Sequence, residues 1–565
     1  MKIKYYIITL SLLAVSLISC KDDYLNIRNE NANISIDKLY STYSYVQGVL
    51  WNTYSYLPDG FASLGMEGAT DNAEFTNESS SFQMFNNGTW NQFTNPDNVW
   101  ASNYAGIRQA NLFLQNYNKI DISYLKNGTV TDSTDYWNAK NNVKFMKGEV
   151  LFLKAFFYFE LVKRYGGVPI INKPMDYADA STWKGIPRNS VDECLRHISL
   201  LCDSAAKIIP VDIDAKYTWY EKGRVTNGAI LALKSRTLLY GASPLFKNQG
   251  STITWADAAK AAYDVIALNK YSLVDGANYA DLFGSGSTTQ SEYIFMRNYG
   301  ATNFIEFANF PIVFDKSTGN SITPSQNLVD AFEVVNAGVS IPFDWTNPAH
   351  ASAPYANRDL RFDASVIYNG SSFSGKTIQT YTGGNSGLPN TNATKTGYYL
   401  KKWQNPTIDL VNNTTAIHAW GYFRYAEILL NYAEAMYNAY GESSDPNGYG
   451  MTALTAFNFV RARAGVSQLA AGALTQAKIE NERRVEFCFE DQRFWDLRRW
   501  NKAEAVLGGP LKKIIITNTG TKAVPVYTYE VKNLENRVFL PKMNWYPIPQ
   551  NEITKTDWKQ NTGWE

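Results

Sequence analysis

The sequence has few of the residues on which metal and redox chemistry depend. It contains only 3 histidines and 4 cysteines in 565 residues. The histidines, His197, His350 and His418, are scattered and lack the spacing of a zinc site. Cys194 and Cys202 lie about 12 Å apart along an expected helix, which is too far for a disulfide. We therefore expect no metal and no cofactor, and we expect these two thiols and Cys488 to be buried.

The chain also has no excess of positive charge, with 53 Lys and Arg against 52 Asp and Glu. Proteins that bind nucleic acid depend on a basic excess or a basic face to neutralise phosphates. We find no Walker loop, no complete dinucleotide fingerprint and no nucleophile elbow. These absences argue against nucleic-acid binding and against the common nucleotide-dependent and serine-hydrolase chemistries.

The N-terminus carries an apolar run that is too short for a confident membrane span. Lys2 and Lys4 precede the run, and Ser19 stands directly before Cys20, as in an export signal. "LISC" resembles the bacterial lipobox, in which the cysteine is lipidated and becomes the first residue. The alternative is an ordinary signal peptide with an incidental cysteine. We expect residues 1–19 to be removed and residues 20–35 to form a lipidated tether.

Helical periodicity covers both ends of the chain. Trp100, Tyr104, Ile107, Asn111 and Leu114 follow one another at steps of four and three, so they share one helical face. Helices are expected at about 99–117, 147–165, 190–208, 226–242, 255–267, 420–439, 450–464 and 474–506. Residues 268–419 are rich in Gly, Ser and Asn, with short strand-like pieces such as "EYIFMRN". This pattern predicts a helical scaffold (about 36–267 and 420–565) interrupted by a long irregular region, all within one domain, 36–565.

The stretch "ERRVEFCFEDQRFWDLRRW" (482–500) combines five arginines, five acids and five large aromatics. Glu482, Glu486 and Glu490 recur every four residues and are expected on one helical face. We expect these acids to pair with arginines of the same stretch, which could instead pair with Glu427 and Glu434. The arginines are Arg483, Arg493 and Arg498. The alternative is a pair of catalytic carboxylates for glycoside hydrolysis, whose carboxyl groups would lie about 5 to 10 Å apart. Acids that pair with arginines have lowered pKa values, whereas a general acid needs a raised pKa. We therefore interpret the stretch as structural.

Aromatic residues are abundant, at 14% of the chain with 37 Tyr, 29 Phe and 15 Trp. An exposed flat ring can stack on the C–H face of a sugar, and nearby amides can bond the hydroxyl groups. Candidate ligand residues are Trp90, Asn91, Phe93, Tyr299, Asn303, Phe304 and Trp345, which lie outside the regular helical faces. Trp90 can equally plug the base of its own loop, and each Phe of 304–310 is more often core.

Several motifs follow one another in an order that is specific in combination. They are "GEVLFLKAFFYFELVKRYGGVPII", "GRVTNGAILALKSRTLLYGASPLF", "ITPSQNLVDAFE", "PYANRDLRF", "FRYAEILLNYAEA", "VRARAG", the stretch 482–500, "YPIPQNEI" and "QNTGW". With the lipobox before them, they make the chain resemble the SusD/RagB family of surface lipoproteins. The resemblance covers most of the mature chain.

The resemblance implies a mainly α fold, in which an α/α superhelix of tetratricopeptide-like helix pairs packs against an irregular half. It also implies non-catalytic capture of a glycan for a SusC-like TonB-dependent β-barrel transporter. "CKDD" (20–23) looks like the signal that sends some lipoproteins to the outer face of the outer membrane. A binding protein for peptides or another non-glycan nutrient is the alternative, and a surface glycoside hydrolase or lyase is a weaker one.

Overall fold

The structure is a computed structural model that describes residues 35–565, except 63, 127–129, 177, 285–290 and 320. The predicted signal peptide, Cys20 and the tether lie outside the described residues. None of the described helices combines the length and apolarity that a membrane span requires.

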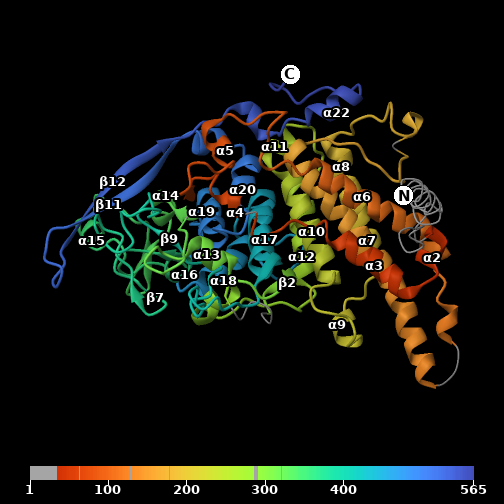
Figure 1. The fold of residues 1–565 in the computed structure, drawn as a ribbon, viewed down its shortest axis with the longest axis horizontal. Coiled ribbons are helices and arrows are strands. Elements are labelled where there is room, and N and C mark those ends of the chain that lie inside the picture. Colours follow the sequence, from red (N-terminus) through yellow and green to blue (C-terminus); the bar gives the residue numbers. More distant parts are fainter. Residues whose placement is uncertain (1–34, 63, 127–129, 177, 285–290, 320) are drawn as a thin grey trace, which may run out of the picture.

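The helices that form one half of the molecule, at the right and centre of Figure 1, are long except for the short N-terminal α2. They are α2 (Ile36–Tyr40), α3 (Tyr43–Tyr54), α6 (Trp100–Asn116), α7 (Val130–Tyr165), α8 (Val191–Ala206), α10 (Asn227–Ala242), α12 (Trp255–Ile266), α17 (Tyr425–Tyr440) and α18 (Ala453–Arg463). From α6 to α18, each helix in this series packs on the next. This is the predicted series of helix pairs, so the mainly α fold is confirmed.

Local sequence signals set several of these helix starts. Ser190 begins α8 and Thr254 begins α12, and each forms a reciprocal capping box with the acid three residues later. Small side chains then allow close packing, because the buried face of α12 consists largely of alanines. These are the positions at which sequence periodicity and structure agree most closely.

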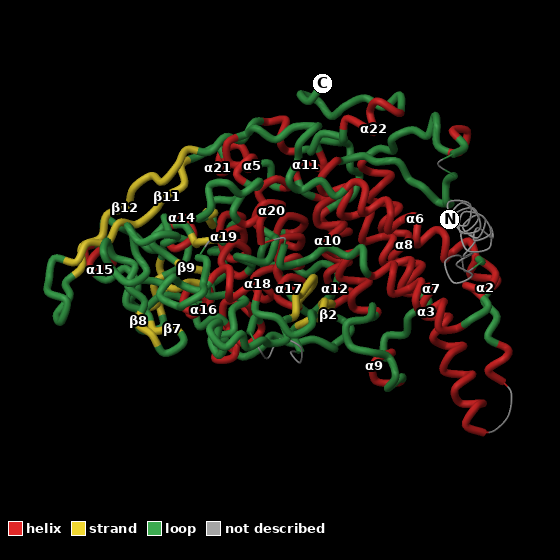
Figure 2. The backbone as a smooth tube through the Cα atoms, in the orientation of Figure 1, coloured by secondary structure: helices red, strands yellow, loops and turns green. Residues whose placement is uncertain are grey.

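Short elements make up the irregular half, at the left of Figure 2. The paired strands are β1 (Ala73–Phe75) with β3 (Ile322–Pro324), β2 (Tyr293–Asn298) with β10 (Ala419–Arg424), β4 (Val334–Asn336) with β5 (Val339–Ile341), β6 (Val366–Ile367) with β9 (Tyr399–Leu400), β7 (Ser372–Phe373) with β8 (Lys376–Thr377), and β11 (Pro510–Asn518) with β12 (Tyr527–Asn536). All six pairs are antiparallel. The β11–β12 hairpin extends along the outside of this half (Figure 2).

Further helices, all of them short except α19, connect these strands and the long helices. They are α4 (Leu64–Glu67), α5 (Gln83–Asn87), α9 (Ile213–Lys216), α11 (Pro244–Lys247), α13 (Phe304–Asn309), α14 (Gln326–Val329), α15 (Pro348–Ser352), α16 (Leu360–Ser365), α19 (Gln476–Glu486), α20 (Arg493–Arg499), α21 (Ala503–Leu507) and α22 (Gln550–Lys555). The main hydrophobic core runs through both halves, and a smaller one that includes Phe310, Phe373 and Tyr399 lies in the irregular half.

Two of the predicted helices are corrected by the structure. The segment 420–439 begins as strand β10 and becomes helical only at Tyr425. The segment 474–506 is three helices, because left-handed backbone conformations, which an α-helix cannot contain, occur at Phe489 (φ 63°) and Asp491 (φ 57°) and again at Asn501 (φ 60°). Glu490 therefore lies beyond the end of α19 and does not share a helical face with Glu482 and Glu486.

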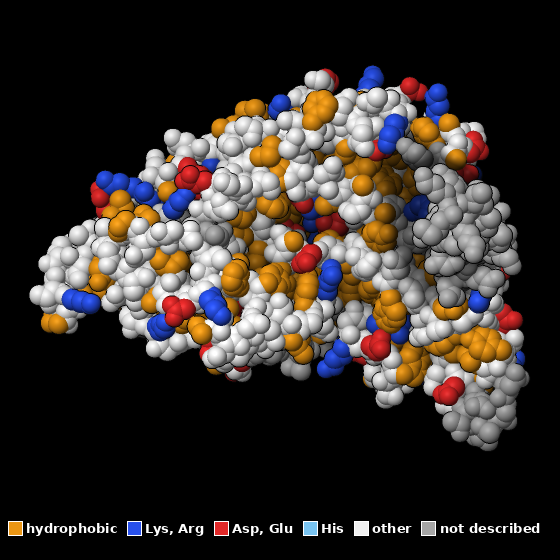
Figure 3. Space-filling model, viewed as in Figure 1, with side chains coloured by type: hydrophobic (Ala, Val, Ile, Leu, Met, Phe, Trp, Pro, Cys, Tyr) orange, Lys and Arg blue, Asp and Glu red, His pale blue; other side chains and the backbone are white. Residues whose placement is uncertain are grey.

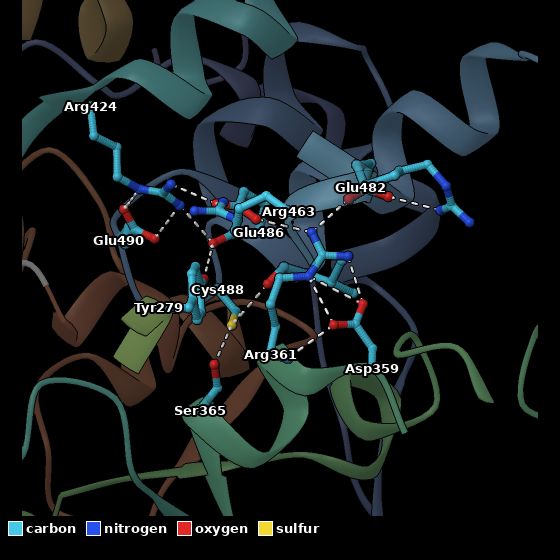
Figure 4. Close-up of polar contacts among 12 residues, drawn as sticks. Tyr279, Asp359, Arg361, Ser365, Arg424, Arg463, Glu482, Glu486, Cys488 and Glu490 are labelled. Carbon is cyan, nitrogen blue, oxygen red and sulfur yellow. Dashed lines mark hydrogen bonds and ion pairs between the residues drawn. The ribbon is translucent and has the colours of Figure 1, made fainter. Parts of the chain in front are cut away.

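The carboxylate of Glu486 is the centre of a buried network of ion pairs (Figure 4). Arg361 of α16 donates to it at 2.9 Å and Arg424 of β10 at 2.6 Å, and Arg463 of α18 donates as well. Glu482 also accepts from Arg361, at 2.6 Å, and Glu490 accepts from Arg424 at 2.7 Å. Glu486 is fully buried and these three arginines are almost so, so the charges are neutralised by one another rather than by water.

Several predicted pairings are wrong in their partners. Arg493 pairs with Asp71 at 2.9 Å, and Arg498 pairs with no described carboxylate but lies over the rings of Trp495 and Tyr546. The nearest partners of Glu427 and Glu434 are Arg236 and Arg499, each at 2.6 Å, and the predicted partner Arg483 lies 3.9 Å from Glu434. The break after α19 turns Arg493 and Arg498 away from the face of Glu482 and Glu486, and arginines distant in sequence take their places.

The network keeps Glu486 ionised. Burial alone would raise the pKa of Glu486, but Arg463, Arg424 and Arg361 together hold that pKa well below its ordinary value. A carboxyl group in this state cannot donate a proton near neutral pH. The geometry therefore agrees with the structural interpretation of the stretch 482–500.

Two further ion pairs join the ends of the chain. Arg493 and Asp71 are separated by 422 residues. Arg537 donates to Glu74 at 2.8 Å across 463 residues. Both pairs are buried. Segments near the start and near the end of the described chain thus pack against each other around α4 and β1.

Glu486→Gln should lower the free energy of unfolding by about 3–5 kcal/mol, because it removes the charge that three buried guanidinium groups share. Guanidinium chloride unfolding measures this loss. Glu530→Gln is the matched control, since its pair with Lys532 is solvent-exposed and should contribute no more than about 1 kcal/mol. Equal, small effects in both variants would contradict a stabilising role for the network.

Candidate ligand-binding surface

Helix α13 presents two phenylalanine rings to solvent. After β2, the chain stays paired with the segment that precedes β10, through Tyr299 N–H to His418 O and Thr302 N–H to Ala416 O. It then turns into α13, whose inward face carries Ile305, Glu306 and Asn309. Phe304 and Phe307 share the outward face and are 43% and 46% exposed. The exposed ring of Phe304 is consistent with its choice as a candidate ligand residue, and the competing interpretation, that the rings of Phe304 and Phe307 belong to the core, does not hold.

A buried carboxylate holds α13 in place from below. Glu306 accepts the backbone N–H of Asn405 at 2.9 Å, and it lies 3.4 Å from Nε2 of His418. Its side chain is fully buried. These contacts fix the helix against the segment before β10, so the two exposed rings have a defined orientation.

Buried aromatic rings support Phe304. Phe61 packs edge-on against Phe304, with ring centroids 5.7 Å apart, and lies 5.0 Å from Tyr299. On its other sides Phe61 meets Trp403 and Trp420, which stack on each other at 4.6 Å. A ring held in this way loses little conformational freedom when a ligand stacks on it.

Polar groups lie beside these rings. Asn303 donates to the side chain of Asn413 at 2.9 Å and to the backbone of Thr414 at 3.0 Å. The hydroxyl of Tyr299 donates to Asp59 at 3.0 Å. Burial, assisted by Asp59, raises the pKa of Tyr299, so its hydroxyl stays neutral. We call the residues Asp59, Tyr299, Asn303, Phe304, Phe307 and Asn413 the α13 surface.

The structure corrects the choice of Trp90 as a stacking platform. Trp90 is only 2% exposed, and its ring packs against Phe85, Tyr546 and Trp564. Neither face of the indole is free for a ligand, so Trp90 plugs the base of its loop. The neighbouring Phe93 is 75% exposed.

Asn91 shapes the loop that carries Phe93. Its side-chain oxygen accepts the backbone N–H groups of Phe93 and Thr94, which leaves it committed to a turn. No described contact joins this loop to the α13 surface. Trp90, Asn91 and Phe93 therefore lie at a different place in the fold from the α13 surface.

Trp345 lies in a third place, after the β4–β5 hairpin. Its indole N–H donates to Asp330 at 3.0 Å, and its ring packs edge-on against Phe343. It is half-buried. Of the predicted ligand residues, the structure brings together Tyr299, Asn303 and Phe304 only.

Sequence reasoning missed Asp59, Phe61 and Asn413. Asp59 and Tyr299 are 240 residues apart, and no local pattern links them. Their contact follows from the pairing of β2 with β10 and from the turn at residues 57–61. In the part of the chain that the structure describes, no three His, Cys, Asp or Glu side chains gather as metal ligands would.

Comparison with protein families gives two matches that follow each other along the chain. A family model described as "SusD family" matches residues 285–564, and one described as "Starch-binding associating with outer membrane" matches residues 23–239. The chain belongs to the SusD/RagB family. Comparison with curated proteins gives no match.

Solved SusD-like structures share this fold over nearly their whole length. A SusD-like protein from Bacteroides fragilis is 27% identical, with a TM-score of 0.75 over 95% of this chain and 99% of that one. A SusD-like carbohydrate binding protein from the same species is 22% identical, with a TM-score of 0.71 over 92% and 99%. Surface glycan-binding protein A from Bacteroides fluxus is 21% identical, with a TM-score of 0.59 over 93% and 100%.

Trp90→Ala should cost about 3–5 kcal/mol of stability, because it leaves a cavity among packed rings. Phe93→Ala, in the same loop, should leave the melting temperature unchanged, because that ring is solvent-exposed. Thermal unfolding of both variants provides the comparison. A Trp90→Ala protein with wild-type stability would show that the ring is not packed as described.

Proposed function

We propose that this SusD/RagB protein is a non-catalytic surface protein that binds a glycan through the α13 surface. The observation that carries the proposal is the pair of exposed rings, Phe304 and Phe307, fixed beside amide and carboxylate groups. Membership of a family with a starch-binding description supports the ligand class. A lipid on Cys20 would anchor the protein, and a SusC-like TonB-dependent transporter would receive the glycan at the outer face of the outer membrane.

The surface suits weak binding. Two half-exposed rings offer a flat platform rather than an enclosing pocket, so we expect dissociation constants between micromolar and millimolar, about −8 to −4 kcal/mol. The transporter would complete the enclosure. Acidic and basic side chains are interspersed on the face drawn in Figure 3, and hydrophobic side chains gather across its middle.

The two other functions differ in measurable ways. A peptide-binding protein would use the same rings, but it would retain peptides rather than polysaccharides in affinity electrophoresis. A hydrolase needs a carboxyl group that can act as a general acid, whereas the carboxylates clustered at 482–490 pair with arginine or lysine. A reducing-sugar assay that detects release dependent on one carboxylate would support the hydrolase.

Phe304→Ala and Phe307→Ala should each weaken glycan binding about thirtyfold, or about 2 kcal/mol, because each removes one stacking ring. Isothermal titration against the polysaccharide best retained in affinity electrophoresis measures the loss. Phe459→Ala is the matched control, since that ring is also exposed, at 48%, but lies on α18. Wild-type affinity in the double variant, with a wild-type melting temperature, would place the binding site elsewhere.

Cys20→Ala should release the protein from the membrane, because the thiol is the only group to which the lipobox chemistry can attach a lipid. Fractionation of cells that express each form measures the release. Protease added to intact cells should degrade the wild-type protein. Protection of the wild-type protein would contradict the outward orientation.

A further inference from the structure

A second concave site lies on the helical half, away from the α13 surface. It is a cavity of about 470 Å³ between α6, the chain at 169–175 and 183–186, and α22. Its lining includes Trp100, Tyr104, Ile107, Ile171, Trp183 and Trp558. The volume is within the range of small-molecule sites, and the lining is mostly apolar, as in such sites. It shares no residue with the α13 surface.

Hydrogen bonds and ring contacts hold the walls together. The hydroxyl of Tyr104 donates to the carbonyl of Pro169 at 2.8 Å, and the indole N–H of Trp558 donates to that of Ile186 at 2.7 Å. The rings of Trp100 and Trp558 are in contact, with centroids 6.0 Å apart. The three segments are thus connected to one another, and the cavity is formed without a ligand.

One wall residue has an unused hydrogen-bond acceptor. Asn111 is 2% exposed, and its amide nitrogen donates to the carbonyl of Ile171 at 2.9 Å, which fixes the orientation of the amide. Its oxygen, Oδ1, has no hydrogen-bond partner. Leaving a buried acceptor unpaired costs free energy, so a ligand that brings a donor to this atom would recover that cost.

Two lining cations are also unpaired. Arg108 lies three residues before Asn111 on α6, and neither Arg108 nor Lys173 forms an ion pair with another described residue. The remaining charges of the lining, Glu552 and Lys555, pair with each other at 3.3 Å. The cavity therefore carries a positive charge in excess.

From these features we infer that the cavity binds a small aromatic acid. A planar ring would lie among the indoles, an N–H or O–H group would donate to Oδ1 of Asn111, and a carboxylate would pair with Arg108 and Lys173. A sugar suits this lining poorly, because most of its hydroxyl groups would face apolar walls without partners. The inference is independent of glycan binding at the α13 surface.

The inference is tested with three ligands that differ by one group each. Indole-3-acetate has the ring, the N–H donor and the carboxylate. 1-Naphthaleneacetate lacks the donor, and indole-3-ethanol lacks the charge. Isothermal titration of the full mature chain should give indole-3-acetate an affinity at least tenfold higher than either analogue. Equal affinities, no detectable binding of indole-3-acetate, or tighter binding of glucuronate would overturn the inference.

Variants then locate the site. Arg108→Met and Lys173→Met keep much of the apolar side chain and should each weaken indole-3-acetate binding about tenfold, while binding of indole-3-ethanol stays unchanged. Arg196→Met on α8 is the control for loss of an exposed arginine. The Phe304→Ala, Phe307→Ala double variant should bind indole-3-acetate like wild type, and a loss of binding there would overturn the assignment to this cavity.

Discussion

The convergence of three guanidinium groups on Glu486 is the interaction on which the arrangement of the two halves depends. Arg463 comes from α18 of the helical half, Arg361 comes from α16 of the irregular half, and Arg424 comes from β10, the strand directly before α17. A buried charge is tolerated only when its partners are all in place. The network therefore admits one relative placement of α16, β10 and α18, whereas apolar packing alone would tolerate small shifts.

That placement reaches the α13 surface through β10. Arg424 is the last residue of β10, and this strand pairs with β2, which leads directly to Tyr299, Asn303 and Phe304. The segment before β10 supplies Asn413 and His418 to the same region. The buried network thus fixes one end of β10, whose other end pairs with the end of β2 that leads to the exposed rings of α13, and the part that meets ligand can vary without disturbing the network.

The features that could be predicted from the sequence are those set by residues close together along the chain. Helical periodicity predicted α6, α8, α10 and α12 to within about two residues, and ordered motifs predicted the family. The break after α19 was missed because Phe489 and Asp491 adopt left-handed conformations without the glycine that usually marks them.

The remaining errors concern contacts between distant segments. Trp90 was expected to be open to ligand, but Tyr546 and Trp564 from the far end of the chain cover it. The arginines that reach Glu482 and Glu486 come from α16, β10 and α18, and a pattern within residues 482–500 contains no information about them. Among the candidate ligand residues, only those that neighbour one another along residues 299–304 were brought together.

The ion pairs that join the two ends of the chain bear on the order in which it can fold. Asp71 meets Arg493 across 422 residues, and Glu74 meets Arg537 across 463. Asp71 and Glu74 can therefore form these ion pairs only after almost the whole chain has been synthesised. A chain interrupted shortly before Arg493 would leave Asp71 without one of its arginines and the base of α4 and β1 uncovered, so such a fragment should be a substrate for proteases rather than a smaller folded unit.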